Sequence, residues 1–249
     1  MISLVQLLKE VQQQPKAILM AGPAGAGKSY TLNQLGLQNF TTINVDDDFE
    51  ELLQKELGKS DFGSMSPEEL SIAAKMMGKA RATTREKEML ATTNLNNIVI
   101  DGTGASYNVI AKKKEELENM GYDVFMVLIY VSPMTSLIRN AERGRSLPTS
   151  AVLKSWSGVV NNIGAYRQLF GTNIVIINND PSDAKKTFDS EEIQKLFPQP
   201  KGKQKSPEEL AKSKAEKEAV NKQIQSLLQQ EPEFDTLETA KSKVNEFTR

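Results

Sequence analysis

The segment from Gly22 to Ser29 reads Gly-Pro-Ala-Gly-Ala-Gly-Lys-Ser and fits the pattern G-x-x-x-x-G-K-[ST] at every position. Several backbone N–H groups must point into one concavity to hold the oxygens of a triphosphate, and glycine tolerates the backbone angles and close approach that this requires. An apolar run at 17–21 precedes the segment, and a helical pattern beginning at Tyr30 follows it. This strand–loop–helix context predicts a phosphate-binding loop and a nucleoside triphosphate site.

The side chains at the end of the loop have separate expected roles. Lys28 supplies a mobile positive charge for the β- and γ-phosphates of ATP, and the Ser29 hydroxyl completes the ligand shell of a Mg²⁺. The alternative is a glycine turn beside an unrelated lysine, which would not need the flanking strand and helix. We expect the nucleotide to contact Gly22, Gly25, Ala26, Gly27, Lys28, Ser29 and Tyr30.

The composition narrows the chemistry further. The chain of 249 residues contains neither cysteine nor histidine. This excludes thiolate chemistry, disulfides, imidazole bases and metal sites built on sulfur or imidazole, so acid–base work falls to Asp, Glu, Lys or Tyr. Any metal is then expected to be a hard, oxygen-bound ion such as Mg²⁺.

Charge and hydropathy predict a cytoplasmic protein with no membrane segment. The net charge is −1, so no overall basic field favours nucleic acid or a membrane surface. Charged Lys9 and Glu10 interrupt the N-terminal stretch, which does not resemble a signal peptide. No run approaches the roughly 18 apolar residues that cross a bilayer.

Apolar strand-length runs alternate with helical patterns, and this alternation predicts a parallel sheet wrapped by helices. The fold class expected is α/β, a P-loop NTPase with a five-stranded, mostly parallel sheet and a helical C-terminal tail. Strands are expected at 17–21, 41–45, 97–101, 124–131 and 173–178. Helices are expected at 3–13, 30–37, 67–93, 107–120 and 148–170, with another opening at Ser132-Pro133. Trp156 is expected to anchor the core rather than to stack on a base.

Three aspartates follow the second expected strand, and ligands gather at the carboxyl ends of strands in such a sheet. A carboxylate there can take the proton of an acceptor hydroxyl as it attacks a phosphate. The alternative is an acidic helix N-terminus that complements the helix dipole. We interpret Asp47 as the general base and Asp48 as the cap of the helix.

Asp101-Gly-Thr103-Gly ends the third expected strand. An acidic residue at this point commonly orients Mg²⁺ or its waters, and Thr103 could donate a hydrogen bond to a substrate. A plain strand-end turn is the alternative. We therefore expect Ser29 and Asp101 at the metal, and Asp47, Asp101 and Thr103 at the acceptor.

Arg139, Arg143 and Arg145 form a third group of candidates. On a helix opened by Ser132-Pro133, Arg139 and Arg143 would lie one turn apart on one face. Such a pair could act as a lid that stabilises charge on the transferring phosphoryl group. A solvated basic helix end is the alternative.

These motifs resemble the zeta-toxin family of kinases. The resemblance includes the P-loop, the segments 43–49 and 100–103, and 120–125 leading into the fourth strand, and it covers roughly residues 15–180. The kinase domain of phage polynucleotide kinase is similar and belongs to the same broad group. The resemblance implies that Asp47 is the general base and that Arg139 and Arg143 are the lid arginines.

Two positions depart from these relatives. Zeta toxins carry Glu where this chain has Asp101, within the motif that contacts the sugar nucleotide. The polynucleotide kinase has a basic residue near the position of Phe49 that helps to hold the 5′ end, whereas this chain has Glu50 and Glu51. Nucleic acid is therefore not the favoured acceptor.

The leading hypothesis is an ATP- and Mg²⁺-dependent kinase in which Asp47, Lys28, Arg139 and Arg143 carry the chemistry. It would transfer the γ-phosphoryl group to a hydroxyl of a small molecule or nucleotide sugar. The alternatives are a 5′-hydroxyl polynucleotide kinase and a nucleotide-dependent interaction or assembly ATPase. Composition divides the chain into a P-loop kinase domain at 1–197, a linker at 198–206 and a helical tail at 207–249. The tail could dock on the domain, bind a protein partner or be mobile.

Overall fold

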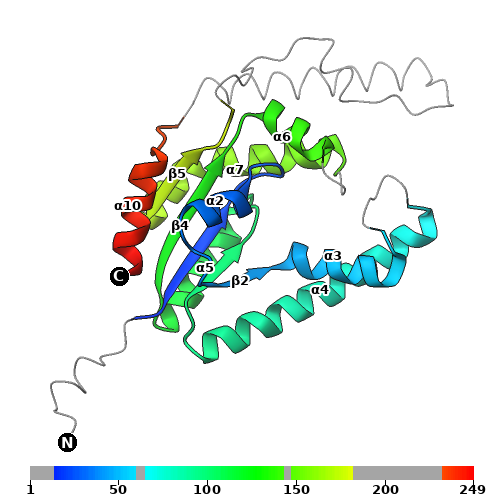
Figure 1. Ribbon diagram of the computed structural model, residues 1–249, viewed down its shortest axis with the longest axis horizontal. Coiled ribbons are helices and arrows are strands. Elements are labelled where there is room, and N and C mark those ends of the chain that lie inside the picture. Colours follow the sequence, from blue (N-terminus) through cyan, green and yellow to red (C-terminus); the bar gives the residue numbers. More distant parts are fainter. Residues whose placement is uncertain (1–13, 60–64, 143–146, 182–231) are drawn as a thin grey trace, which may run out of the picture.

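The computed structural model describes residues 14–59, 65–142, 147–181 and 232–249. A five-stranded sheet lies at its centre in the order β2-β3-β1-β4-β5, and every neighbouring pair of strands is parallel (Figure 1). The strands are β1 (Lys16–Ala21), β2 (Thr41–Asn44), β3 (Ile98–Asp101), β4 (Asp123–Tyr130) and β5 (Ile174–Asn178). The predicted α/β fold with a five-stranded parallel sheet is confirmed.

Helices follow the strands with ends that the sequence signals. They are α2 (Lys28–Gln34), α3 (Val45–Leu57), α4 (Pro67–Thr93), α5 (Tyr107–Asn119), α6 (Pro133–Ala141), α7 (Thr149–Phe170) and α10 (Leu237–Thr248). Ser66 and Glu69 form a reciprocal capping box at the start of α4. The helix expected at 3–13 lies outside the described residues. Among the described helices, none is long and apolar enough to cross a membrane.

Two apolar layers cover the two faces of the sheet. On one face, α5 and α7 pack against the sheet around Trp156 and Tyr166, which are both fully buried. Trp156 also donates its indole N–H to the carbonyl oxygen of Val131 at 2.8 Å, which confirms it as a core anchor. On the other face, α2 and α10 cover residues such as Ile18 and Phe125. β4 is apolar and buried from Val124 onward, as expected for a strand that is covered on both faces.

Helices α3 and α4 form an arm that extends from the β2 edge of the sheet (Figure 1). The arm has an apolar cluster of its own, separate from the two layers on the sheet. Phe49 and Leu53 of α3 pack there against Ala73, Met76 and Ala80 of α4. Packing against α4 therefore fixes the position of α3, and with it the three aspartates at its start.

The described end of the expected tail belongs to the layer that covers the sheet. Ala240 and Val244 of α10 are fully buried, and the Phe247 ring lies 4.9 Å from that of Phe125. Asp235, just before α10, forms an isolated parallel bridge with Ile177 of β5. The expected linker at 198–206 and the tail residues up to 231 lie outside the described residues.

Candidate active site

The phosphate-binding loop connects β1 to α2 and requires glycine at two positions of left-handed backbone. Gly25 has φ +77° and Gly27, the N-cap of α2, has φ +81°. A Cβ atom at Gly25 would lie 2.8 Å from the carbonyl oxygen of Ser136, and one at Gly27 would lie 2.5 Å from Nδ2 of Asn179. A side chain at either position would therefore strain the backbone and collide with its support.

Three side chains from outside the loop hold three consecutive carbonyl groups of it. The Ser136 hydroxyl donates to the carbonyl oxygen of Ala24, Arg139 Nη1 donates to that of Gly25 at 3.2 Å, and Asn179 Nδ2 donates to that of Ala26 at 2.8 Å. The C=O and N–H of a trans peptide point in opposite directions. Fixing these carbonyls therefore also fixes the N–H directions of Gly25 and Gly27, on which anion binding by such a loop depends. ATP binding itself stays a prediction.

Lys28, Asp101 and Asn44 are connected at the carboxyl ends of three adjacent strands. Nζ of Lys28 donates to the carbonyl oxygen of Gly22 at 3.2 Å and lies 3.8 Å from Oδ1 of Asp101. Oδ2 of Asp101 accepts from Nδ2 of Asn44 at 3.3 Å. The register explains the meeting, since Asp101 of β3 is level with both Met20 of β1 and Asn44 of β2.

Asn44 is also the N-cap of α3, because its side-chain oxygen accepts from the N–H of Asp46 at 2.9 Å. The expectation that Asp48 caps this helix is therefore wrong. Asp48 is instead buried and accepts hydrogen bonds from Thr84 and Lys87 of α4. Burial would raise the pKa of Asp48, but the hydrogen bonds from Lys87 and Thr84 outweigh it and hold the pKa below its ordinary value.

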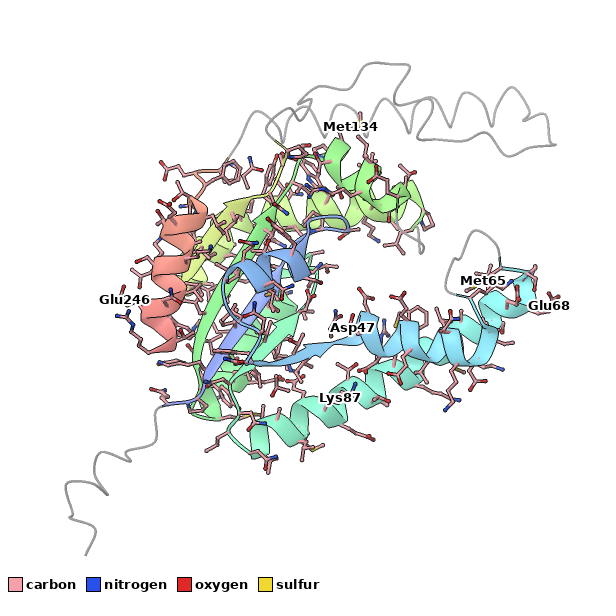
Figure 2. The ribbon with its side chains drawn as sticks, viewed as in Figure 1. Asp47, Met65, Glu68, Lys87, Met134 and Glu246 are labelled. Carbon is pink, nitrogen blue, oxygen red and sulfur yellow. The ribbon has the colours of Figure 1, made fainter. Side chains whose placement is uncertain are left out.

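Asp47 lies in the first turn of α3, at the end of the arm nearest the sheet (Figure 2). Its side chain is exposed, unlike that of Asp48. Partial desolvation raises the pKa of Asp47, and the neighbouring Asp46 carboxylate raises it further, while a hydrogen bond from Asn44 opposes the shift. A raised pKa makes this carboxylate a stronger proton acceptor than an ordinary aspartate.

The structure places one of the candidate lid arginines against the loop. The half-buried Arg139 donates to Gly25 and, through Nη2, to the carbonyl oxygen of Asn179 at 3.0 Å. Helix α6 ends at Ala141, so the helical spacing that paired Arg139 with Arg143 does not extend that far. Arg143, like Arg145, lies outside the described residues.

The loop after β3, which carries Thr103, is tied to the P-loop and to α7. Gly22 N–H donates to the carbonyl oxygen of Thr103 at 3.0 Å. Tyr166 of α7 donates its hydroxyl to Gly104 at 2.7 Å, and Asn162 donates its amide to Ala105 at 3.1 Å. Burial raises the pKa of Tyr166 to about 12, so the hydroxyl stays a donor. Sequence reasoning missed Asn162, because its partner Ala105 lies 57 residues away and no local pattern pairs the two.

Ser29 and Asp101 offer the kind of oxygen donors that Mg²⁺ prefers. Ser29 is exposed at the start of α2, whereas the Asp101 side chain is only 9% exposed beside Lys28. No group of three or more acidic side chains that could enclose an ion occurs in the described part of the chain. The donor set therefore suits an ion that takes much of its shell from the phosphates of a nucleotide and from water. Tyr30, the last expected nucleotide contact, is 61% exposed on α2.

The family model for the zeta toxins matches residues 4–193. The chain belongs to the Zeta toxin family. A search of curated proteins finds no match to the chain. Together with the fold, membership of the Zeta toxin family supports assignment of the chain as a P-loop kinase, with the acceptor not identified.

The solved structures that match the chain include a toxin–antitoxin system and an ORF1:ORF2 complex. The PezAT chromosomal toxin–antitoxin system of Streptococcus pneumoniae matches at 23% identity, over 90% of this chain and 94% of that chain, with a TM-score of 0.45. The AvrRxo1-ORF1:-ORF2 complex with ATP matches at 14% identity, over 99% of this chain and 85% of that chain, with a TM-score of 0.54. The same complex with sulphate ions matches at 13% identity, over 100% and 84%, with a TM-score of 0.55. At such low identity, the two AvrRxo1 likenesses concern the fold alone.

Proposed function

We propose that this protein is an ATP- and Mg²⁺-dependent kinase that phosphorylates a hydroxyl group of a small molecule or nucleotide sugar. The observation that carries the proposal is the connection of Lys28, Asp101 and Asn44 beside the exposed carboxylate of Asp47. A charge for the phosphates, a carboxylate for a metal and a carboxylate for the acceptor proton thus share one edge of the sheet. ATP in the AvrRxo1 complex, which has the same fold, supports the choice of nucleotide.

In this proposal, Asp47 accepts the proton of the acceptor hydroxyl while the oxygen bonds to the γ-phosphorus of ATP and the bond to ADP breaks. Lys28 offsets the charge on the phosphates, and Arg139 and Arg143 stabilise the transferring group. A Mg²⁺ held by Ser29 and Asp101 would neutralise the phosphate oxygens when bound. The hydroxyl of Thr103 would donate to the acceptor. Its loop is fixed against the P-loop, since the carbonyl oxygen of Thr103 accepts from the N–H of Gly22.

All of these residues lie in the expected kinase domain, 1–197, which we propose as the catalytic part of the chain. The region 198–206 would be a linker, and 207–249 a tail that ends in α10. We also propose a protein partner, since a relative in fold is a complex of two chains. The buried face of α10 is not available to it, because Ala240 and Val244 already pack on the sheet.

Incubation with Mg²⁺ and γ-labelled ATP against a panel of acceptors tests the proposal. The panel holds nucleotide sugars, nucleosides and their monophosphates, other small alcohols, and 5′-hydroxyl DNA and RNA, with a sample lacking acceptor. Label on a small molecule or nucleotide sugar, absent with Asp47→Asn, supports the proposal. Label on oligonucleotides, with the steep salt dependence of phosphate contacts, would replace it by a polynucleotide kinase. Release of free phosphate at one rate in every sample would favour the assembly ATPase.

A further inference from the structure

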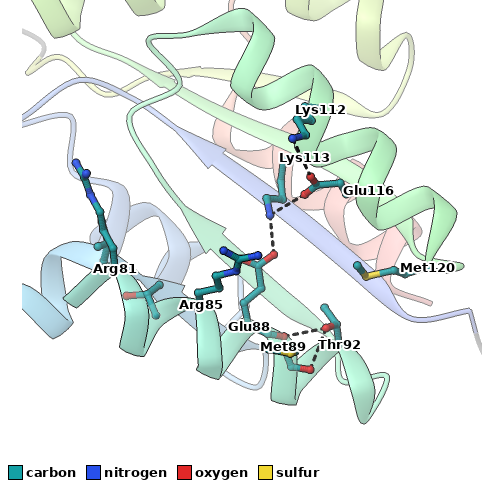
Figure 3. A pocket seen from close by; sticks show the side chains of 11 residues that line it. Arg81, Arg85, Glu88, Met89, Thr92, Lys112, Lys113, Glu116 and Met120 are labelled. Atoms are coloured by element: carbon teal, nitrogen blue, oxygen red, sulfur yellow. Dashed lines mark hydrogen bonds and ion pairs between the residues drawn. The ribbon is translucent and has the colours of Figure 1, made fainter. Parts of the chain in front are cut away.

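A groove of about 800 Å³ lies between α4 and α5, separate from the P-loop. Its volume falls within the roughly 300–1,000 Å³ of sites for small molecules. Figure 3 shows Arg81 and Arg85 on the α4 side of the groove and Lys112 on the α5 side. No residue of this groove has a role in the chemistry described above.

One end of the groove lies at the edge of the sheet that carries the candidate active site. Helix α4 leads into the start of β3, so its end at Thr92 lies near the amino ends of the strands. Arg81 precedes Thr92 by eleven residues and so lies about 16 Å from it along the helix axis, at 1.5 Å per residue, beyond the positions where Thr84 and Lys87 contact Asp48 of α3. Val45, two residues before Asp47, also lines the groove. A ligand in this end of the groove would therefore approach the start of α3.

The acidic residues of the groove are already paired with lysines. Lys113 contacts Glu88 at 2.8 Å and Glu116 at 3.0 Å, and Lys112 lies 3.8 Å from Glu116. Burial lowers the pKa of Lys113, but its hydrogen bonds with the two glutamates outweigh this and raise the pKa above its ordinary value. The lysines and glutamates thus largely neutralise one another.

The positive charge left in the groove belongs to Arg81 and Arg85. Both side chains are exposed, and neither has a hydrogen bond or ion pair with any residue in the described ranges. They lie one turn apart on one face of α4, a spacing at which like charges destabilise a helix. A ligand that bridged the two guanidinium groups would offset this repulsion.

We infer that the acceptor carries a phosphate group and that Arg81 and Arg85 bind it at this end of the groove, with the acceptor hydroxyl toward Asp47. Guanidinium groups match phosphate oxygens with paired N–H donors, and two of them suit a dianion better than a single carboxylate. The inference rests on the proposed kinase function. It makes Arg81 and Arg85 residues that determine acceptor specificity, whether the phosphate belongs to a sugar phosphate or to a nucleotide.

Binding to the full-length protein tests the inference without turnover. With the P-loop saturated by a non-hydrolysable ATP analogue and Mg²⁺, calorimetry would compare uridine monophosphate with uridine, and glucose 6-phosphate with glucose. We expect one phosphorylated form to bind more tightly than its unphosphorylated partner. In Arg81→Ala/Arg85→Ala we expect this advantage to fall on the order of tenfold to hundredfold, as for hydrogen bonds to charged groups.

Lys75→Ala/Lys79→Ala is the matched control, because these lysines are also exposed and one turn apart on α4 but do not line the groove. It should bind as the wild type does. The arginine variant should melt at the same temperature as the wild type or higher, since it loses a repulsive pair. No advantage for either phosphate, or an equal advantage in the arginine variant, would overturn the inference. If the wild type prefers a phosphorylated form and the arginine variant loses this preference, but no acceptor is phosphorylated, the phosphate site would stand and the kinase function alone would be rejected.

Discussion

The side-chain amide group of Asn44 connects the start of α3 with the end of β3. Its oxygen caps α3 and so orients the turn that carries Asp47, while its nitrogen donates to Asp101 at 3.3 Å. Asparagine is favoured both as an N-cap and wherever one side chain must accept and donate at once. The expected base and the expected metal ligand are therefore positioned by the same residue, although neither contacts the other in any described hydrogen bond.

Replacing Asp47 with asparagine tests its role as a base. Asp47→Asn keeps the size of the side chain but cannot accept the proton, so we expect turnover to fall on the order of 10²–10⁴. ATP affinity should change little, because Asp47 lies on α3 rather than in the P-loop. Single-turnover kinetics and nucleotide titration would measure the two effects. Glu50→Gln, an exposed change on the same helix, is the control, and wild-type turnover in Asp47→Asn would remove this residue from the mechanism.

The raised pKa of Asp47 predicts how the rate depends on pH. A base is inactive when protonated, so the rate should fall on acidification at a pH above 3.8, the ordinary value for this carboxyl. Desolvation is the main cause and the Asp46 charge the next. Asp46→Asn removes that charge and should move the acidic limb to lower pH, which initial rates across the acidic range would show. A limb that stays in place would mean that another group controls the rate.

At the scale of elements, the arm of α3 and α4 shows what a sequence can and cannot predict. The capping signal at Ser66 and the apolar run of β4 are local, and both elements form as expected. The role of Asp48 is not local, because it depends on which face of α4 meets α3. The contact of Asn162 with the loop after β3 was unpredictable for the same reason, since the residues lie 57 apart in the chain.

Asp48→Ala should destabilise the arm by removing its buried connection to Lys87 and Thr84. Hydrogen bonds to a charged group suggest a loss of about 1.5–3 kcal/mol in the free energy of unfolding. Because the folded pKa of Asp48 is lowered, this contribution is present above the unfolded value and is lost as pH falls through the folded pKa. Urea denaturation at neutral and acidic pH would show a difference from the wild type that shrinks on acidification. Glu51→Ala, an exposed change on α3, should have little effect, and an equal loss there would contradict the assignment to Asp48.

At the scale of the whole molecule, the C-terminal segment supports the phosphate-binding loop through β5. Asp235 bridges to Ile177 and accepts from the N–H of Ile176 at 2.9 Å, so it holds the edge strand of the sheet. Asn179, directly after β5, donates to the carbonyl oxygen of Ala26 in the loop at 2.8 Å. The end of the chain and the P-loop are therefore connected through one strand, although more than two hundred residues separate them.

This connection predicts that α10 contributes to the stability of the domain. Val244 is fully buried in the layer that α10 forms with Ile18 and Phe125, so Val244→Ala removes two methyl groups from a packed site. We expect a loss of about 2 kcal/mol in the free energy of unfolding, from the lost burial and the cavity that remains. Chemical denaturation would measure it, with the exposed Glu246→Ala of the same helix as the control. An unchanged midpoint in Val244→Ala would mean that α10 does not pack on the sheet in solution. The support of the P-loop would then come from β5 and its neighbours alone.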